Sequence, residues 1–261
     1  MRPLSNDKIE IRRDGEILRV WLNRPNVLNA LDTDVLTGIA DIFTDLNQSF
    51  EVRCVILGGR GRAFSAGADR KASPGAERMS AVSGASDRER RWASQVGHRA
   101  CAAISNCEIP TIARVQGWCV GGGLGLAVSC AFRIAADDAT FSIPEVDLGI
   151  PLSWGCTPRL IDEIGATKAR QLIMMCDQID AAEAERLHLV NRTVAADQLD
   201  SVVNDWAARL VSKPEIAVHG TMTQFRSYAH RATLGNVTET DGDVLMGASR
   251  TAAAKASFAG F

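Results

Sequence analysis

The sequence has few aromatic residues, no excess of charge of either sign and no long apolar run. Phenylalanine, tyrosine and tryptophan make up 5% of the 261 residues, and 29 basic against 31 acidic side chains leave a net charge of −2. This balance gives no basic surface of the kind that binds nucleic acid or a membrane, so we expect neither partner. Nowhere do roughly 18 apolar residues follow one another, and the opening segment MRPLSNDKIE has no apolar stretch typical of a secretory signal. We therefore predict a cytoplasmic protein.

Paired cysteines and metal-binding spacings are missing as well. The seven cysteines are scattered without a C-x-x-C pair, and the four histidines never occur at the spacing of metal ligands. We therefore predict reduced thiols in apolar surroundings, and neither a metal nor a redox cofactor. With 46% hydrophobic and 23% charged residues, the chain suits a globular protein long enough to bury a sizeable core.

Hydrophobic periodicity predicts strands alternating with helices first and helices alone afterwards. Alternating residues around Asp14-Gly15 predict a β-hairpin, and Asp32 or Thr33 can cap the helix that follows. The strands predicted after the hairpin are 54–57, 111–115, 132–135 and 140–143. The predicted helices are Thr33 to about 48, 87–105 with Trp92 on its apolar side, the glycine run to Cys130, 155–163, 167–176, 181–188, 197–212, 214–231 and one within 244–261. This order indicates an α/β core followed by a helical C-terminal part.

Two glycine-containing turns each join a predicted strand to a predicted helix. The first spans Arg62 to Asp69, and the second is the run Gly121-Gly122-Gly123-Leu124-Gly125. A helix start presents unpaired N–H groups, and glycine lets a ligand oxygen approach the backbone closely. Two such turns side by side could form an oxyanion hole, although glycines serve tight helix–sheet packing equally well. The run does not fit the dinucleotide-binding fingerprint G-x-G-x-x-G, whose sixth position would fall on Leu126 or Val128.

The first turn also comes close to the nucleophile elbow of serine hydrolases. The segment Ala63-Phe64-Ser65-Ala66-Gly67 differs by one residue from the pattern G-x-S-x-G. Ser65 would then be the nucleophile, with His188 or His219 as its base. We do not favour this alternative, because alanine stands where the elbow needs its first glycine.

Five short parts of the chain share a pattern, in order and spacing, with one known family. They are Leu22–Pro25 with Leu28–Leu31, Ala63–Asp69, Gly117–Gly123, Phe141–Glu145 with Leu148-Gly149, and Ala182–Ala184 with Leu189–Asn191. With these parts as the matching motifs, the sequence resembles the enoyl-CoA hydratase/isomerase (crotonase) superfamily along nearly its whole length. The resemblance implies an α/β fold, a spiral of strand-strand-helix (ββα) units, over residues 1–195. It also implies a helical segment over 196–261 that builds homotrimers, often paired into homohexamers.

The same resemblance implies an acyl-CoA or enoyl-CoA thioester as substrate and assigns residues to its binding. The N–H groups of Ala68 and Gly122 would form an oxyanion hole around the thioester carbonyl. The residues implied to lie near the CoA and acyl groups are Arg24, Ala66, Asp69, Arg70, Lys71 and Trp154. Of these, Arg24 and Lys71 are cations suited to the CoA phosphates. CoA then arrives as part of the substrate and not as a separate cofactor.

Hydratases of this family resemble one another in carrying two glutamates, and here one is missing. The second falls on Glu145, whereas the first falls on Gly125, which has no side chain. A single carboxylate suits an enoyl-CoA isomerase, in which one group moves a proton between two carbons and the double bond shifts from the 3 to the 2 position. Apolar residues on both sides of Glu145 should raise its pKa toward neutrality.

Other activities remain open at this point. They are an atypical hydratase with Asp147 as replacement carboxylate, another enolate-forming lyase or hydrolase, and a non-catalytic CoA-binding paralogue. His188 stands where the family usually has glycine, and we expect it to change a helix end without a catalytic role. In the tail, Lys255, Phe258 and Phe261 could reach a ligand or a neighbouring subunit.

Overall fold

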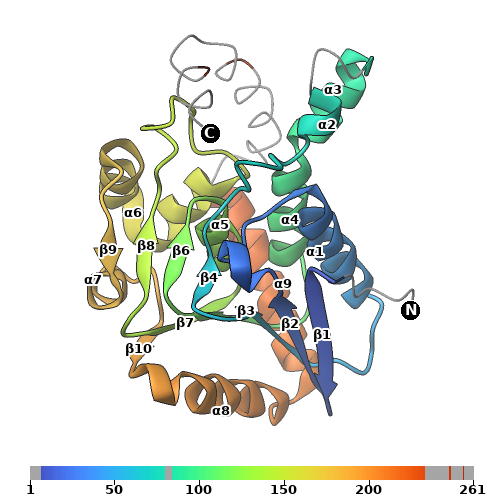
Figure 1. The fold of residues 1–261 in the computed structure, drawn as a ribbon. Helices are drawn as coiled ribbons and strands as arrows, with labels where there is room; N and C mark the ends of the chain where they lie inside the picture. Colours follow the sequence, from blue (N-terminus) through green and yellow to red (C-terminus); the bar gives the residue numbers. More distant parts are fainter. Residues whose placement is uncertain (1–6, 80–83, 233–246, 248–254, 256–261) are drawn as a thin grey trace.

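The computed structural model describes residues 7–79, 84–232, 247 and 255, and its strands form two sheets (Figure 1). The larger sheet has the strand order β1-β2-β3-β5-β7-β10, and the smaller has the order β4-β6-β8-β9. The strands of the larger sheet are β1 (Ile9–Asp14), β2 (Ile17–Leu22), β3 (Cys54–Gly59), β5 (Thr111–Val115), β7 (Phe132–Ala136) and β10 (Arg192–Val194). The strands of the smaller sheet are β4 (Ala63–Ser65), β6 (Trp118–Val120), β8 (Thr140–Ser142) and β9 (Ile179–Asp180).

The N-terminal hairpin is present as predicted. β1 and β2 pair antiparallel with Asp14 opposite Ile17, and Gly15 turns the chain at a φ of 59°. This positive φ is the conformation that glycine supplies in tight hairpins. β2 then starts the parallel part of the larger sheet by pairing with β3.

After the hairpin the chain alternates between the two sheets. β3, β5 and β7 each enter the larger sheet, and each is followed by a strand of the smaller sheet, β4, β6 or β8, and then by helices. Each repeat advances the chain by one strand in both sheets, so the predicted spiral of ββα units is confirmed. β4 and β6 are parallel neighbours, which places the turns that follow these two strands side by side.

Helices cover both faces of the larger sheet. Along β3, Val55 and Leu57 face a core that includes residues of α1 and α4, whereas Cys54 and Ile56 pack on the other face with residues of α8. The α-helices are α1 (Thr33–Leu46), α2 (Ala76–Met79), α3 (Asp87–Ser94), α4 (Val96–Ser105), α5 (Gly122–Val128), α6 (Cys156–Met175), α7 (Ala181–Arg186), α8 (Leu199–Val211) and α9 (Glu215–Ala232), with short 3-10 helices η1 (Pro25–Val27) and η3 (Ala196–Gln198).

The start of α1 follows from its sequence. The Asp32 side chain accepts a hydrogen bond from Val35 N at 2.9 Å, which satisfies one of the free N–H groups of the first turn. The residues at helical spacing that α1 buries are Val35, Leu36, Ile39, Ile42, Phe43 and Leu46. The helix therefore begins and packs as its pattern predicts.

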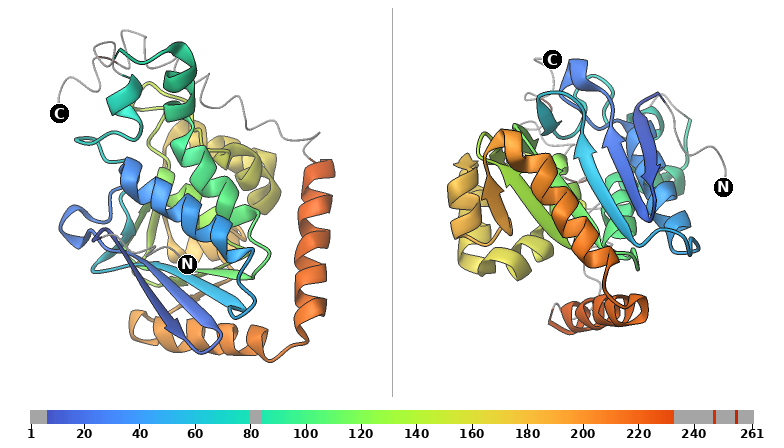
Figure 2. Two further views of the ribbon diagram at one scale, coloured as in Figure 1. Left: turned by 90° about the vertical axis from the view of Figure 1, so that its right-hand side faces the viewer. Right: turned by 90° about the horizontal axis from the view of Figure 1, so that it is seen from below.

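The last two described helices differ in how they pack. α8 lies across the larger sheet, where Trp206 meets Phe132 edge-on at a centroid distance of 5.6 Å. α9 stands beside the body of the molecule as a separate rod (Figure 2). Its Ile216 and Phe225 are 84% and 70% exposed. Within the described part of the chain, none of the helices combines the length and the apolar character needed to cross a bilayer.

Several sequence predictions need correction. The helix predicted over 87–105 breaks at Gln95, whose φ of −97° and ψ of 9° separate α3 from α4. Trp92 therefore leaves the apolar side, is 57% exposed and lies under the Arg99 guanidinium, 3.8 Å from it. β4 and β6 fall within segments that the sequence predicts as turns, because each strand has only three residues and glycines lie within two residues of both ends. Of the segment 244–261, in which a helix is predicted, only residues 247 and 255 are described; Lys255 is exposed, and Phe258 and Phe261 lie outside the described residues.

Candidate active site

The first glycine turn follows β4 and is fixed by the segment that precedes α1. Ala66 N donates to Leu28 O at 2.8 Å, Leu31 N donates to Gly67 O at 2.8 Å, and Asp69 N donates to Leu31 O at 2.9 Å. Leu31 is paired with Ala68 in parallel register, so the N–H of Ala68 points away from this segment. Ala68 is exposed. Its N–H is therefore available to a ligand.

Asn29 holds that segment in place. It is buried at a φ of 55°, a left-handed conformation that asparagine tolerates better than most residues. Its Oδ1 accepts from Arg24 N at 2.8 Å, and its Nδ2 donates to Ala63 O at 2.8 Å and to Arg60 O at 2.9 Å. The sequence analysis missed this role, although asparagine beside a predicted turn is a usable signal.

Asp69 and Arg24 are engaged with each other and with the turn. Asp69 Oδ1 accepts from Lys71 N at 2.9 Å and Ala72 N at 3.0 Å, and Oδ2 accepts from Arg24 Nη1 at 2.8 Å. Burial alone would raise the pKa of Asp69, but the Ala72 N–H and the Arg24 guanidinium hold it below its ordinary value. Arg24 also lies 3.4 Å from Asp32. The structure thus places both side chains at the base of the turn.

The second glycine turn joins β6 to α5. Gly121 has a φ of 49° and a ψ of −116°, which a residue with a side chain adopts only under strain, and its N–H donates to Ser142 O at 2.9 Å. Gly122 is the first residue of α5, so its N–H has no partner within the helix. It is the second N–H that the sequence analysis assigned to an oxyanion hole.

The two turns lie against each other because their contact residues are glycines. A Cβ on Gly67 would lie 3.6 Å from Gly122 N and 2.8 Å from Val120 O, and one on Gly123 would lie 2.8 Å from Ser65 Cβ. Side chains at these positions would force the turns apart. The structure thus brings the turn of Ala68 and the start of α5 together, and their role as an oxyanion hole remains a prediction.

Glu145 lies at the same place, in the turn after β8. A Cβ on Gly121 would lie 2.5 Å from its Oε1, so the carboxyl group contacts the residue before Gly122. Its Oε2 is buried and has no hydrogen-bond partner among the described residues. Burial raises the pKa of Glu145 from 4.5 to about 7, against a smaller lowering effect of its own backbone N–H. A carboxyl group with this pKa can both take and return a proton near neutral pH.

The space beside Gly125, where the resemblance places a second glutamate in hydratases, is filled. A Cβ on Gly125 would lie 2.6 Å from Cys156 Sγ, 3.5 Å from Cys101 Sγ and 3.9 Å from Trp154 Cε3. A longer side chain would meet these groups directly. The other carboxylate considered for this role, that of Asp147, is exposed to solvent.

The remaining predicted residues lie around the first turn. Arg70 and Lys71 are exposed, and Ala66 is partly buried between Ser65 and Gly67. The structure therefore places these cations at the surface of the turn.

The serine-hydrolase alternative fails on geometry. Ser65 is fully buried, and its Oγ donates to Asn29 O at 2.8 Å and accepts from Gly67 N at 3.2 Å. His188, one of the two candidate bases, is exposed in the turn after α7. Ser65 supports the turn and is not placed as a nucleophile.

Within the described ranges, no group of histidine, cysteine and acidic side chains is arranged to hold a metal ion.

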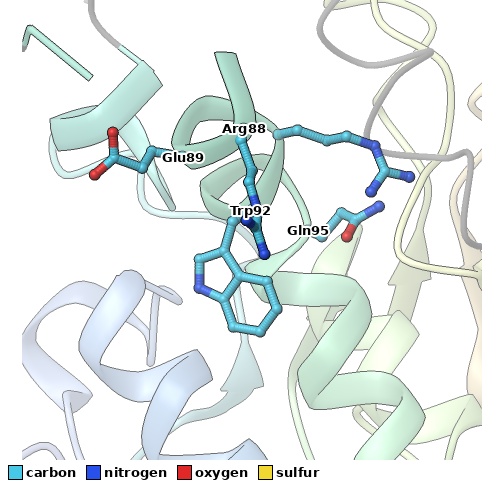
Figure 3. Close-up of a pocket in the computed structure, with 5 residues that line it drawn as sticks. Arg88, Glu89, Trp92 and Gln95 are labelled. Atoms are coloured by element: carbon cyan, nitrogen blue, oxygen red, sulfur yellow. The ribbon is translucent and has the colours of Figure 1, made fainter. Parts of the chain in front are cut away.

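Two other cavities lie apart from this site. One runs along α3 and is lined by Arg88, Glu89, Arg91, Trp92 and Gln95; Figure 3 shows Glu89 pointing to the opposite side from Arg88 and Gln95. The other, about 880 Å³, lies between α4, α6 and α9 and has Arg159 and Phe225 in its lining. Neither includes Ala68, Gly122 or Glu145 in its lining.

Comparisons with known proteins identify the family and the fold of the chain. The model of the enoyl-CoA hydratase/isomerase family matches residues 12–261. A crotonyl-CoA hydratase of Syntrophomonas wolfei subsp. wolfei is 36% identical over 82% of this chain and 80% of its own length. A peroxisomal Delta(3,5)-Delta(2,4)-dienoyl-CoA isomerase of Arabidopsis thaliana is 32% identical over 80% of this chain and 76% of its own.

Solved structures show the same architecture. An enoyl-CoA hydratase/isomerase from Mycobacterium paratuberculosis superposes with a TM-score of 0.88 at 25% identity, covering 98% of this chain and 99% of that one. A monofunctional enoyl CoA isomerase from M. smegmatis superposes with a TM-score of 0.68 at 29% identity, covering 86% of this chain and 94% of that one.

Proposed function

The chain belongs to the enoyl-CoA hydratase/isomerase family, and from this premise we propose that it isomerises enoyl-CoA thioesters, moving the double bond from the 3 to the 2 position. Acyl-CoA thioesters are the substrates of the family. In this proposal Glu145 is the single acid/base, and the N–H groups of Ala68 and Gly122 hold the thioester oxygen.

The state of Glu145 is the observation that carries the proposal. Burial raises its pKa to about 7, its Oε2 has no partner among the described residues, and its Oε1 lies against Gly121. A base with this pKa is half ionised near neutral pH and retains the proton that it takes. That is what a reaction needs when one group must remove and return the same proton.

The surroundings of Gly125 favour isomerisation over hydration. Water addition has to orient a water molecule and move two protons, for which a second carboxylate is useful. Here two thiols and an indole fill the place of that carboxylate, and Asp147 is exposed. Relatives named as hydratases are nevertheless 36% and 35% identical, so hydration is the second candidate. A CoA-binding protein without catalysis is the third.

The proposed reaction needs only groups of this chain, since the proton that leaves the substrate is returned to it. The Glu145 carboxylate removes a proton from C2 of the 3-enoyl thioester, and the electron pair of that C–H bond moves into a dienolate. The negative charge that develops on the thioester oxygen is stabilised by the two N–H groups, which are fixed before the reaction. Glu145 then returns its proton to C4. The double bond now lies between C2 and C3, and no water is consumed.

Several residues around the first turn would support binding of the thioester. We propose that exposed Arg70 and Lys71 lie beside the CoA, with Lys71 near its phosphates, and that Ala66 lies near the CoA and acyl groups. Arg24, the other cation expected near the phosphates, and Asp69 would act mainly by holding the turn, since they are bonded to each other at 2.8 Å. CoA enters as part of the substrate, and the reaction as written uses no metal or redox cofactor.

We further propose that the molecule forms a homotrimer, alone or paired into a homohexamer, through residues 196–261 as its assembly segment. The exposed apolar side chains of α9 support this assignment, because Ile216 and Phe225 are left in solvent by a single chain. Residues 1–195 would form the catalytic core. The cytoplasmic location also remains a prediction.

A paired assay tests the proposed reaction. The full-length protein is given a 3-enoyl-CoA and a 2-enoyl-CoA of equal chain length, and isomerisation and hydration are measured separately. We expect isomerisation without hydration, and kcat/KM rising with pH through an apparent pKa near 7. Glu145→Gln should reduce isomerisation by at least about a hundredfold, the usual contribution of a general base.

The matched control is Asp147→Asn, which neutralises an exposed carboxylate two residues away and should leave the rate unchanged. Full activity of Glu145→Gln would refute its role as the base. Efficient hydration by the wild type would establish the second candidate instead. Binding of both thioesters without turnover would support the third.

A further inference from the structure

The Trp154 indole occupies a slot between α4 and α5 that two glycines create. A Cβ on Gly97 of α4 would lie 2.0 Å from Trp154 Cε2, and a Cβ on Gly122 of α5 would lie 2.1 Å from Trp154 Cζ3. Trp154 is 8% exposed. No side chain other than hydrogen fits at either glycine while the ring stays in place.

The ring is held there although its backbone is strained. Trp154 has a φ of 61°, which is unusual for a bulky residue and typical of places where the surroundings dictate the conformation. Arg159 fixes the adjoining backbone by donating to Gly155 O at 2.7 Å and to Trp154 O at 3.3 Å. Arg159 Nε also donates to Ser105 Oγ at 2.9 Å, which ties the loop to α4. The position of the indole is thus defined from two sides.

The slot adjoins the groups that would act on the thioester. Gly122 supplies the N–H of α5, and Gly121 before it contacts the Glu145 carboxyl group. A thioester oxygen on that N–H, with its C2 facing Glu145, would direct the following acyl carbons along the indole. Because the ring already fills the space up to α4, those carbons have little room beyond the reacting double bond.

We propose that Trp154 sets substrate specificity by closing the acyl pocket against α4, so that the protein accepts short, unbranched acyl-CoA thioesters. This inference rests on the proposed acyl-CoA site, and it adds the class of acyl group. Gly97 contributes to the same specificity, since it makes room for the Trp154 ring. The carboxylate and the N–H groups perform the chemistry, and Trp154 selects the chain on which they act.

Binding of saturated thioesters tests the inference without requiring turnover. Dissociation constants of butyryl-CoA and octanoyl-CoA are measured by titration calorimetry for the full-length wild type, Trp154→Ala and Trp154→Phe. We expect the wild type to prefer butyryl-CoA. Trp154→Ala should shift the ratio toward octanoyl-CoA by at least about tenfold, because each methylene newly buried is worth roughly fourfold in affinity. Trp154→Phe should shift it in the same direction by less.

Trp92→Ala is the matched control, since this tryptophan is 57% exposed on α3, and the ratio should not change. Circular dichroism verifies the fold, and if Trp154→Ala does not fold, Trp154→Phe decides. An unchanged ratio in the folded Trp154 variants, or no binding of butyryl-CoA to the wild type, overturns the inference. A ratio that shifts while 3-butenoyl-CoA is not isomerised leaves the inference standing and refutes the proposed reaction. Isomerisation of 3-butenoyl-CoA with an unchanged affinity ratio overturns the inference and leaves the proposed reaction standing.

Discussion

Glu145 binds its proton more tightly in the folded protein than in the unfolded chain. Its pKa rises from 4.5 to about 7 on burial, so ionisation opposes folding. The unfolded chain holds fewer protons than the folded one between these two values, and the wild type therefore loses stability as the pH rises through this window. A shift of this size is worth on the order of 3 kcal/mol. Glu145→Gln removes the ionisable group and should remove this loss.

We therefore predict that Glu145→Gln is more stable than the wild type at about pH 8, and that its advantage shrinks toward about pH 5. Urea unfolding at both values measures the difference. Asp147→Asn serves as control, since it replaces an exposed carboxyl group two residues away and should change the free energy of unfolding only slightly. An advantage for Glu145→Gln that grows toward acid would contradict the raised pKa.

His188 offers a second residue-level prediction. It is exposed at a φ of 63° in the turn that ends α7, where Leu189 N donates to Ala184 O at 2.8 Å. Glycine adopts this conformation without the penalty that a Cβ imposes. His188→Gly should raise the free energy of unfolding by about 0.5–1 kcal/mol, after the greater freedom of glycine in the unfolded chain is subtracted. Thermal unfolding measures this, with His188→Ala as the control that keeps the Cβ and should not stabilise.

Two glycines inside helices, Gly97 and Gly220, carry the matching prediction for helical elements. Gly220 in α9 has nothing within 4 Å of a built Cβ, so Gly220→Ala should stabilise by about 0.5–1 kcal/mol through helix propensity. Gly97→Ala in α4 gains the same propensity but meets the Trp154 ring at 2.0 Å, and should destabilise by about 1–3 kcal/mol.

A double-mutant cycle separates these effects. In a Trp154→Ala background the methyl group at position 97 has room, so Gly97→Ala should become neutral or stabilising there. Urea unfolding of the four proteins of the cycle gives the coupling energy. An equal cost of Gly97→Ala with and without the indole would show that the slot is not shaped by this contact.

Local patterns predict the elements where neighbours in sequence dictate the structure. The hairpin at Asp14-Gly15, the cap at Asp32 and the strand Thr111–Val115 were all predicted, since turn chemistry, capping and apolar runs are local. The break at Gln95 was not predicted, because apolar residues at helical spacing continue on both sides of it and Gly97, two residues on, lies inside α4. Pairing with a distant strand defines β4 and β6, and a window of neighbouring residues does not contain that information.

The candidate site shows the same difference between features that local sequence predicts and features that depend on contacts between distant residues. Glu145 and the two turns were found through motifs, and its apolar neighbours correctly indicated a raised pKa. The slot that holds the Trp154 indole is formed by Gly97 and Gly122. These three residues are far apart in the sequence. No spacing rule links them, so the contact appears only when the spiral has been built.

We propose that α9 takes part in the assembly of whole molecules. This helix stands beside the body of the chain (Figure 2), with Phe225 and Ile216 exposed and a cavity of about 880 Å³ between it and α4 and α6. Exposed apolar side chains next to such a groove are typical of surfaces that a partner covers. A second copy of the chain is the partner that we propose.

Phe225→Asp should therefore shift the protein from trimer or hexamer toward monomer, because a charge would be buried at the proposed interface. Light scattering coupled to size-exclusion chromatography gives the mass. Phe50→Asp is the control, since Phe50 is 89% exposed in the turn after α1. An unchanged mass for Phe225→Asp would place the interface elsewhere.

The crowding around Gly125 also constrains how such a site can change over generations. A glutamate gained first at position 125 would meet Cys156 Sγ at 2.6 Å from its Cβ, with the indole and a second thiol behind it. A smaller side chain at position 156 would ease the gain of a second carboxylate, because the Cys156 thiol is the group that the new Cβ would meet first, whereas the indole and the second thiol lie at ordinary contact distances. Substitutions at positions 125 and 156 should therefore be coupled, so that the effect of either one depends on the residue present at the other.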